Sequence, residues 1–262
     1  MSLSGKTLAN TYKDILQMDN SNSGVDATTR SIKDGEGTTS ALSLSDDVVS
    51  VKPQSDNTTA TFLVEDSSGT DLLVVDSTNS KVKALGNYLN TQYACFSVGN
   101  TQSASFADDT HQAIPFASAM YGDVSYPPAF GTGTDPATSF TTSEGNGTRA
   151  SDITACLWYL PDAISIDSVT SIEGADTATG DTTRMHLFSY DFTSGATACL
   201  TNGTLLAHNS DVTNAGSEQP YLSSWTVDSA AVASGKVILA FLKSDSINSD
   251  YSLNIKVKYH LT

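Results

Sequence analysis

The segment YSLNIKVKY, residues 251–259, alternates apolar and polar side chains without a break. Leu253, Ile255, Val257 and Tyr259 are the later apolar members, and polar residues, including two lysines, stand between them. Successive side chains of a β-strand point to opposite faces of its sheet, so this pattern is typical of a strand with one face in a core and the other in water. The segment therefore predicts a β-strand at a sheet surface.

Seven other segments of residues 91–262 have the length and composition of strands, and turn-rich loops separate them. They are residues 93–98, 153–159, 164–172, 183–192, 204–207, 223–227 and 236–242. Together with residues 251–259 they make eight strands, which predict an all-β fold with a jelly-roll-like β-sandwich. Both tryptophans, Trp158 and Trp225, fall inside these patterns, so we expect them to pack in the core.

Residues 102–150 have few long apolar runs but carry several aromatic side chains. They predict a long ordered loop at one end of the sandwich, where ligand contacts are commonly placed. Tyr121, Tyr126 and Phe130 lie around a pair of prolines, and aromatic rings stack on sugars or peptides with little loss of entropy. These three residues are the candidate ligand contacts.

A repeat with a period of ten residues occupies residues 61–90, which read TFLVEDSSGT, DLLVVDSTNS and KVKALGNYLN. The spacing predicts a β-meander, in which Phe62, Leu72 and Val82 occupy equivalent positions. A few short strands are marginal in water, and strands that are apolar on both faces need neighbours on both sides. Identical chains around a three-fold axis supply such neighbours, so we expect a homotrimer. Packing against the C-terminal domain of the same chain is the alternative.

The first 30 residues differ from the rest, because Leu8, Tyr12, Ile15 and Leu16 recur at helical spacing before a run of Asn, Ser and Gly. This pattern is shorter than the roughly 12 to 15 residues that an isolated helix needs in water. We therefore expect it to be ordered only where a larger particle or neighbouring chains cover these four side chains. The predicted division is an anchoring segment at 1–30, a β-repeat shaft at 31–90 and a β-sandwich tip at 91–262.

The net charge of −16, from 13 basic and 29 acidic residues, opposes nucleic-acid binding, because neutralising phosphates requires Lys and Arg. An anionic membrane surface is disfavoured for the same reason. The opening MSLSGKT has no apolar core of a signal peptide, and the apolar run at residues 237–242 is too short to span a bilayer. We expect folding in a reducing cytoplasm, with no membrane insertion.

No sequence motif for catalysis or nucleotide binding occurs, and the four histidines are scattered. Cys95, Cys156 and Cys199 sit in apolar, strand-like contexts, so we expect buried free thiols. His186 falls inside a strand, which favours a buried structural histidine. The sequence predicts no enzyme and no cofactor.

Two acidic stretches supply oxygen atoms of the kind that calcium prefers: EGADTATGD at residues 173–181, and Asp108-Asp109 beside His111. Neither follows the spacing of an EF-hand loop. Gly, Asp and Thr are also the residues of ordinary hairpin turns, and this is the simpler interpretation.

The run LSGKTLANTYKDILQMDNSNSGVDATTRSIKDGEGTTSALSLSDD, residues 3–47, resembles the N-terminal region of virion structural proteins from marine tailed bacteriophages. The repeat that follows is similar to the beginnings of fibre shafts in such proteins. AAVASGKVILAFLKSDS and YSLNIKVKYHL, near the C-terminus, resemble the closing strands of jelly-roll tip domains in phage fibres and head appendages.

The resemblance implies a homotrimeric fibre, spike or capsid-decorating appendage that is part of the virion. Its N-terminus would bind other virion proteins, and its tip would face a host glycan or protein. The function so implied is host adhesion or particle stabilisation, without catalytic residues. A carbohydrate-binding, lectin-like receptor-binding domain is the alternative. A depolymerase is a third class, but the chain is too short and irregular for the long β-helix that such enzymes use.

Overall fold

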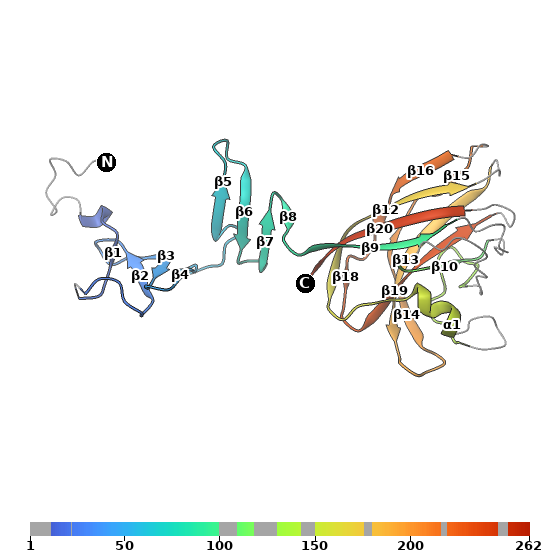
Figure 1. Ribbon diagram of the computed structural model, residues 1–262, viewed down its shortest axis with the longest axis horizontal. Coiled ribbons are helices and arrows are strands. Elements are labelled where there is room, and N and C mark those ends of the chain that lie inside the picture. Colours follow the sequence, from blue (N-terminus) through green and yellow to red (C-terminus); the bar gives the residue numbers. More distant parts are fainter. Residues whose placement is uncertain are drawn as a thin grey trace. The chain divides into compact units, whose positions relative to one another are not determined.

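The computed structural model describes residues 12–21, 23–99, 109–117, 130–142, 150–175, 180–215, 219–245 and 251–262. Nearly all of its regular structure is antiparallel β-sheet, which confirms the all-β prediction. The chain divides into two compact units, Met1–Leu89 and Asn90–Thr262. Each unit contains its own sheets (Figure 1). The finer division of the first unit into an anchor and a shaft stays a prediction.

The N-terminal unit begins, within its described part, with a 3-10 turn at Tyr12–Asp14. A four-stranded antiparallel sheet follows, with its strands in chain order: β1 (Gln17–Met18), β2 (Arg30–Lys33), β3 (Thr39–Leu44) and β4 (Val49–Val51). Leu42 pairs with Val51 and Leu44 with Val49. Strands β3 and β4 are therefore neighbours in this sheet.

The ten-residue repeat forms the second sheet of this unit, and the predicted meander is confirmed (Figure 1). Its strands are β5 (Phe62–Glu65), β6 (Asp71–Asp76), β7 (Lys81–Ala84) and β8 (Asn87–Tyr88). The repeated aspartates close its turns. The Asp66 carboxylate accepts the backbone N–H groups of Ser68 and Thr70, and the Asp76 carboxylate accepts that of Asn79. Hydrogen bonds from Ser68 and Thr70 hold the pKa of Asp66 at about 2.

The C-terminal unit is a sandwich of two antiparallel sheets. The first sheet has the order β16 (Gln219–Ser224), β12 (Ile164–Ala175), β20 (Tyr251–Leu261) and β9 (Thr91–Val98), and β18 (Ala231–Val232) adds to β12. The second sheet has the order β10 (Gln112–Ile114), β19 (Lys236–Ser244), β13 (Thr182–Phe192), β14 (Leu200–His208) and β17 (Thr226–Val227). In this second sheet β11 (Trp158–Tyr159) adds to β19, and β15 (Val212–Thr213) adds to β13.

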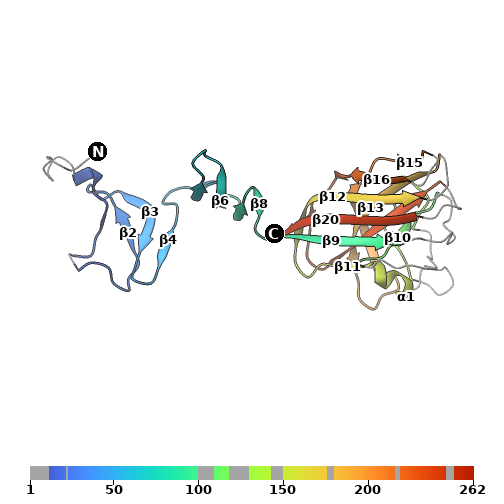
Figure 2. The same ribbon diagram turned by 45° about the horizontal axis from the view of Figure 1, so that its top comes forward.

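The connectivity of the eight main strands is nested. The first pairs with the last (β9 with β20), the second with the seventh (β10 with β19), the third with the sixth (β12 with β16) and the fourth with the fifth (β13 with β14). Figure 2 shows β9, β20 and β12 side by side in one sheet. This nesting, with the strands distributed over two sheets, is the connectivity of a jelly roll.

The second sheet is buried on both faces. Along β19, Ile238, Ala240 and Leu242 belong to the core between the two sheets. The alternate residues Val237, Leu239 and Phe241 belong to a second core on the opposite face. A strand buried on both faces is apolar at successive positions. The run VILAFL, residues 237–242 of β19, therefore shows no alternation of apolar and polar residues.

The second core is covered by a segment that the sequence predicted wrongly. Residues 153–159 are mostly helical: α1 (Ala150–Ile153) leads into a 3-10 helix at Thr154–Cys156. Ile153 and Cys156 are buried, three residues apart, whereas the two residues between them are exposed. This spacing places both apolar side chains on one face of a helical turn, and the Thr154 hydroxyl donates to the Ala150 carbonyl at 2.5 Å.

Candidate functional site

The four anchor residues of the N-terminus are placed only in part. Leu8 lies outside the described residues. Tyr12 begins the 3-10 turn, Ile15 is half-buried, and Leu16 is 70% exposed. Leu16 is therefore largely uncovered by the described residues of this chain, and the anchoring role of the four residues stays a prediction.

Of the three candidate ligand contacts, the structure describes one. Tyr121 and Tyr126 lie outside the described residues. Phe130 is buried, with 1% of its surface exposed, and its ring packs against Phe140 and Phe241 at centroid distances of 4.6 and 5.2 Å. Its aromatic side chain stabilises the second core, so it does not contact a ligand at the surface. An aromatic residue between turn-forming residues does not reveal whether it points inward or outward.

Other sequence expectations concern buried side chains. Trp158 and Trp225 are both buried, and the Trp225 indole donates to the Ser171 hydroxyl at 2.9 Å, so the predicted core packing is confirmed. All three cysteines are free thiols, of which Cys156 and Cys199 are buried and Cys95 is half-buried. His186 is buried as predicted.

The β5–β8 meander exposes a set of large apolar side chains, which we call the meander surface. Its members are Phe62, Leu63, Val64, Leu72, Val82, Leu85 and Leu89, each 37–71% exposed. On β5 these side chains lie on both faces of the strand, because Phe62 and Val64 alternate with Leu63 and all three are about equally exposed. Among the described residues of Met1–Leu89, no apolar side chain is buried.

Polar side chains gather where β13 begins and β19 ends. They line an open cleft with about 290 Å³ of space for water, which we call the charged cleft. Its lining residues are Asp109, Thr134, Thr182, Arg184, Asp211, Lys243, Ser244 and Asp245. Arg184 Nε lies 2.6 Å from Asp211 Oδ1, and Lys243 Nζ lies 3.3 Å from Asp109 Oδ1. The cleft therefore offers paired charges of both signs.

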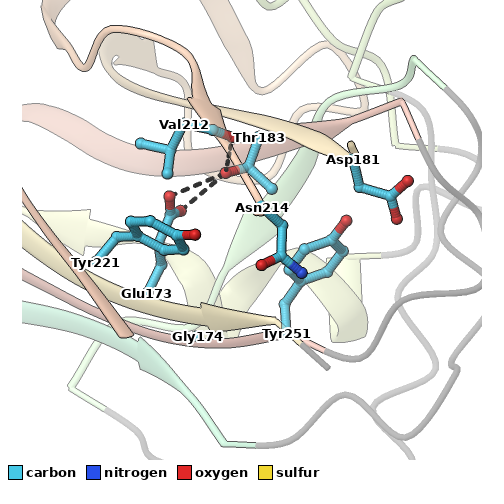
Figure 3. Close-up of a pocket in the computed structure, with 8 residues that line it drawn as sticks. All are labelled: Glu173, Gly174, Asp181, Thr183, Val212, Asn214, Tyr221 and Tyr251. Carbon is cyan, nitrogen blue, oxygen red and sulfur yellow. Dashed lines mark hydrogen bonds between the residues drawn. The ribbon is translucent and has the colours of Figure 1, made fainter. Parts of the chain in front are cut away.

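A smaller hollow lies at the same end of β13 and is lined by Glu173, Gly174, Asp181, Thr183, Val212, Asn214, Tyr221 and Tyr251 (Figure 3). Thr183 donates its hydroxyl to the carboxyl group of Glu173, with both carboxyl oxygens at 3.0 Å. Glu173 is 3% exposed, and burial raises its pKa to about 7. A carboxyl group with this pKa exchanges its proton near neutral pH.

Three histidines form a row beside the charged cleft. The ring centroids of His111 and His186 are 4.9 Å apart, and those of His186 and His208 are 6.5 Å apart. Burial, with the neighbouring positive charges, lowers the pKa of His186 to about 3, and burial also lowers the pKa of His111. Both buried rings are therefore neutral at pH 7. The contact of His186 Nε2 with Asp135 Oδ1, at 3.4 Å, is not an ion pair at that pH.

In the part of the chain that the structure describes, no three His, Cys, Asp or Glu side chains come close enough together to bind a metal ion. No helix of that part is long and apolar enough to cross a membrane.

A comparison with protein-family models found no match to this sequence, and a comparison with curated proteins found none either. Solved structures with a similar chain path include an Eiger TNF from S. frugiperda, with a TM-score of 0.29 and 9% identity over 66% of this chain and 94% of that chain. They also include an aminopeptidase from a marine sediment archaeon, Thaumarchaeota archaeon, with a TM-score of 0.32 and 9% identity. That match covers 71% of this chain and 40% of the aminopeptidase chain.

Proposed function

We propose that this chain is a non-enzymatic structural protein that assembles with copies of itself through the meander surface, as a fibre, spike or decoration protein of a bacteriophage particle. The observation that carries this proposal is the exposure of seven large apolar side chains on a four-stranded meander. Large exposed apolar side chains gathered on one small sheet indicate an interaction site. A short meander without a buried face is also marginal by itself.

Identical chains are the partners that suit this surface best. Phe62, Leu63 and Val64 expose apolar surface on both faces of β5, so one partner on one face would leave the other in water. In a ring of three copies each meander meets two neighbours, one for each face. A closed ring of this kind is one of the common symmetric arrangements of homo-oligomers.

The resemblance of residues 3–47 to virion proteins of marine tailed phages suggests the setting of this assembly. In this proposal the N-terminal segment docks on other virion proteins, and the sandwich faces the host or solvent. A chain that lacks residues 1–26 should then still form a trimer but no longer join the particle. Binding of that truncated chain to purified particles would contradict the docking role.

Light scattering coupled to size-exclusion chromatography tests the self-assembly directly. The full chain should elute with three times the mass of the 27.5 kDa protomer. Val64→Lys, which places a charge on the meander surface, should lower that mass to that of a monomer. Ser67→Lys is the matched control, because it adds the same charge to the exposed turn of the same hairpin and should stay trimeric. A wild-type monomer at micromolar concentration would overturn the proposal.

A second function, carbohydrate binding by the sandwich, is favoured by the charged cleft. Its hydroxyl, carboxylate and guanidinium groups are donors and acceptors that suit sugar hydroxyls, and its volume of about 290 Å³ is near the lower end for small-ligand sites. This cleft replaces the predicted aromatic contact at Phe130.

A glycan array separates the two functions. Binding that is lost in Asp211→Ala and retained in Asp162→Ala would place a sugar in the charged cleft. Asp162 is the control because it is an exposed aspartate outside the residues that line the cleft. No signal across a broad array would count against carbohydrate binding and leave the self-assembly unaffected.

A further inference from the structure

The β1–β4 sheet of the N-terminal unit has two chemically different faces. Figure 2 shows its strands β2, β3 and β4 side by side. In an antiparallel sheet, residues that pair across neighbouring strands point to the same face, and successive residues of one strand point to opposite faces. Leu42 pairs with Val51 and Leu44 pairs with Val49, so these four apolar side chains gather on one face. We call them the β3–β4 apolar face.

The other face of the same strands is polar. Ser31 on β2 pairs with Ser43 on β3, which in turn pairs with Ser50 on β4. The Ser43 hydroxyl donates to the Ser31 hydroxyl at 3.3 Å. A row of serines suits a surface in water. The sheet is therefore amphipathic, whereas strand β5 of the meander exposes apolar side chains on both faces.

The β3–β4 apolar face is incompletely covered by the described part of this chain. Val49 is 71% exposed and Val51 is 38% exposed, while Leu42 and Leu44 are half-buried. A sheet with one apolar face is stabilised when another layer packs on that face. Its serine face needs no cover, so the partner has to lie on one side only.

The charges around this face permit contact between identical chains. A chain with a net charge of −16 repels its copies unless the contact surface is close to neutral. Arg30 pairs with Leu44 and so belongs to the apolar face, but its guanidinium forms an ion pair with the Asp26 carboxylate. The strands thus add no net charge to this face. Asp46 and Asp47 are exposed in the turn that follows β3, at the rim, where salt screens their repulsion.

The chain itself brings other copies of this face together. Residues 52–61 join β4 to β5 and span at most about 35 Å when fully extended. When the meanders of three chains associate, this linker holds all three β1–β4 sheets near the common contact and gives them a high effective concentration. The same face of a neighbouring chain is therefore the partner that the assembly supplies.

We propose that the β3–β4 apolar face packs against the same face of two neighbouring copies around the three-fold axis of the trimer. This inference rests on the proposed self-assembly through the meander surface. The apolar side chains are then buried at the axis, and the row of serines faces solvent. A closed ring of three satisfies a sheet that is apolar on one face only, because every copy turns that face inward.

Chemical cross-linking tests which face points to the axis. Cys95 is the half-buried native cysteine, whereas Cys156 and Cys199 are buried, so the full chain with Cys95→Ser serves as the background. In this background Val49→Cys, treated with a short trifunctional maleimide, should give several-fold more covalent trimer on a denaturing gel than Ser50→Cys. Ser50 is the matched control, because it is the next residue of the same strand and points to the other face.

Dilution followed by light scattering measures the contribution of the face to assembly. Val49→Asp should raise the protein concentration at which the trimer dissociates by about tenfold or more, because a carboxylate without a partner would be buried at the axis. Ser50→Asp adds the same charge to the face that points to solvent and should leave that concentration almost unchanged.

The outcomes separate this inference from the proposed function. A trimer in which Val49→Cys and Ser50→Cys cross-link equally would overturn the inference and leave assembly through the meander surface in place. A monomeric full chain would overturn both. A thiol at Val49→Cys that reacts freely with a monofunctional maleimide in the trimer, and is protected only when purified phage particles are added, would show that a virion protein covers this face, and would also overturn the inference.

Discussion

The two units of this chain differ in where they keep their apolar side chains. In the described residues, every buried apolar side chain lies in Asn90–Thr262, where two cores form on the two faces of one sheet. Met1–Leu89 has two four-stranded sheets, but the large apolar residues that the structure describes in it are at best half-buried. The sandwich is thus stabilised by its own contacts, whereas the described part of the N-terminal unit has backbone pairing and capped turns but no core.

The comparison of the two units shows that a unit can form β-strands without having a core that makes it stable by itself. The turns of the meander are specified locally, by the side chains of Asp66 and Asp76. Hydrogen-bonded turns contribute little net free energy, and burial of apolar surface is the main term that favours folding. A unit with turns but no core should therefore obtain its stability from a partner.

Separating the two units tests this contrast with the largest expected effect. Residues 90–262 expressed alone should unfold in one cooperative thermal transition followed by circular dichroism. Residues 1–89 should show no cooperative transition at concentrations where light scattering reports a monomer. A cooperative transition in monomeric residues 1–89 would mean that the N-terminal unit is stable by itself.

Truncating one apolar side chain in each unit should give very different losses of stability. Phe241→Ala empties part of the second core and should lower the free energy of unfolding of the sandwich by about 3–5 kcal/mol. Leu89→Ala changes a residue of the N-terminal unit that is 62% exposed. It should change the free energy of unfolding of the sandwich by less than about 0.5 kcal/mol. Denaturant unfolding followed by tryptophan fluorescence measures both, because the chain's two tryptophans, Trp158 and Trp225, lie in the sandwich. Equal losses would contradict the contrast.

A pH dependence confined to the sandwich is the third expected effect, and its size depends on the pH interval compared. Folding lowers the pKa of His186 from 6.5 to about 3, so the unfolded chain binds a proton that the folded chain excludes between these values. Stability is then highest above pH 6.5 and falls by about 1.4 kcal/mol for each pH unit below it, until the folded-state pKa is reached. Glu173 acts in the opposite direction, because its pKa is raised from 4.5 to about 7 and its contribution is lost as the pH rises through that range.

Denaturant melts at pH 7 and pH 5 isolate the histidine when wild type is compared with His186→Gln. The variant should lose less stability between the two pH values, since glutamine does not titrate. His208→Gln serves as the control, because His208 is partly exposed and pairs with Asp228 at 2.8 Å. An unchanged pH dependence in His186→Gln would show that other groups dominate the acid response.

The fold was predictable where apolar side chains follow a local rule. Strands β12, β13, β19 and β20 and the meander were all expected from periodicity, apolar composition or the ten-residue repeat. The turn of helix before Trp158 was missed because Ile153, Cys156 and their neighbours form a short apolar run that suits a strand equally well. Strand β10 was missed because Gln112–Ile114 is too short to show a period.

The candidate sites were less predictable, because they depend on residues that are distant in sequence. The stretch at residues 173–181 was noted for its oxygen atoms, but Asn214 joins it only through the pairing of β15 with β13. The burial of Phe130 depends likewise on the second core, which covers the far face of the sheet that contains β19. The exposure of the meander was foreseeable, because a small meander has too few strands to cover its own faces.

The position of β19 sets the order of events during synthesis. Both cores of the sandwich contain side chains of β19. Strand β9 stays without its partner until β20 has been synthesised, because Val98 on β9 pairs with Leu253 on β20. The ribosome therefore releases the N-terminal unit and most of the sandwich strands before either core can close, and such distant pairing folds slowly. The meander surface is therefore present on the nascent chain before the sandwich has folded. Assembly with other copies of the chain must then accompany or follow the folding of the sandwich.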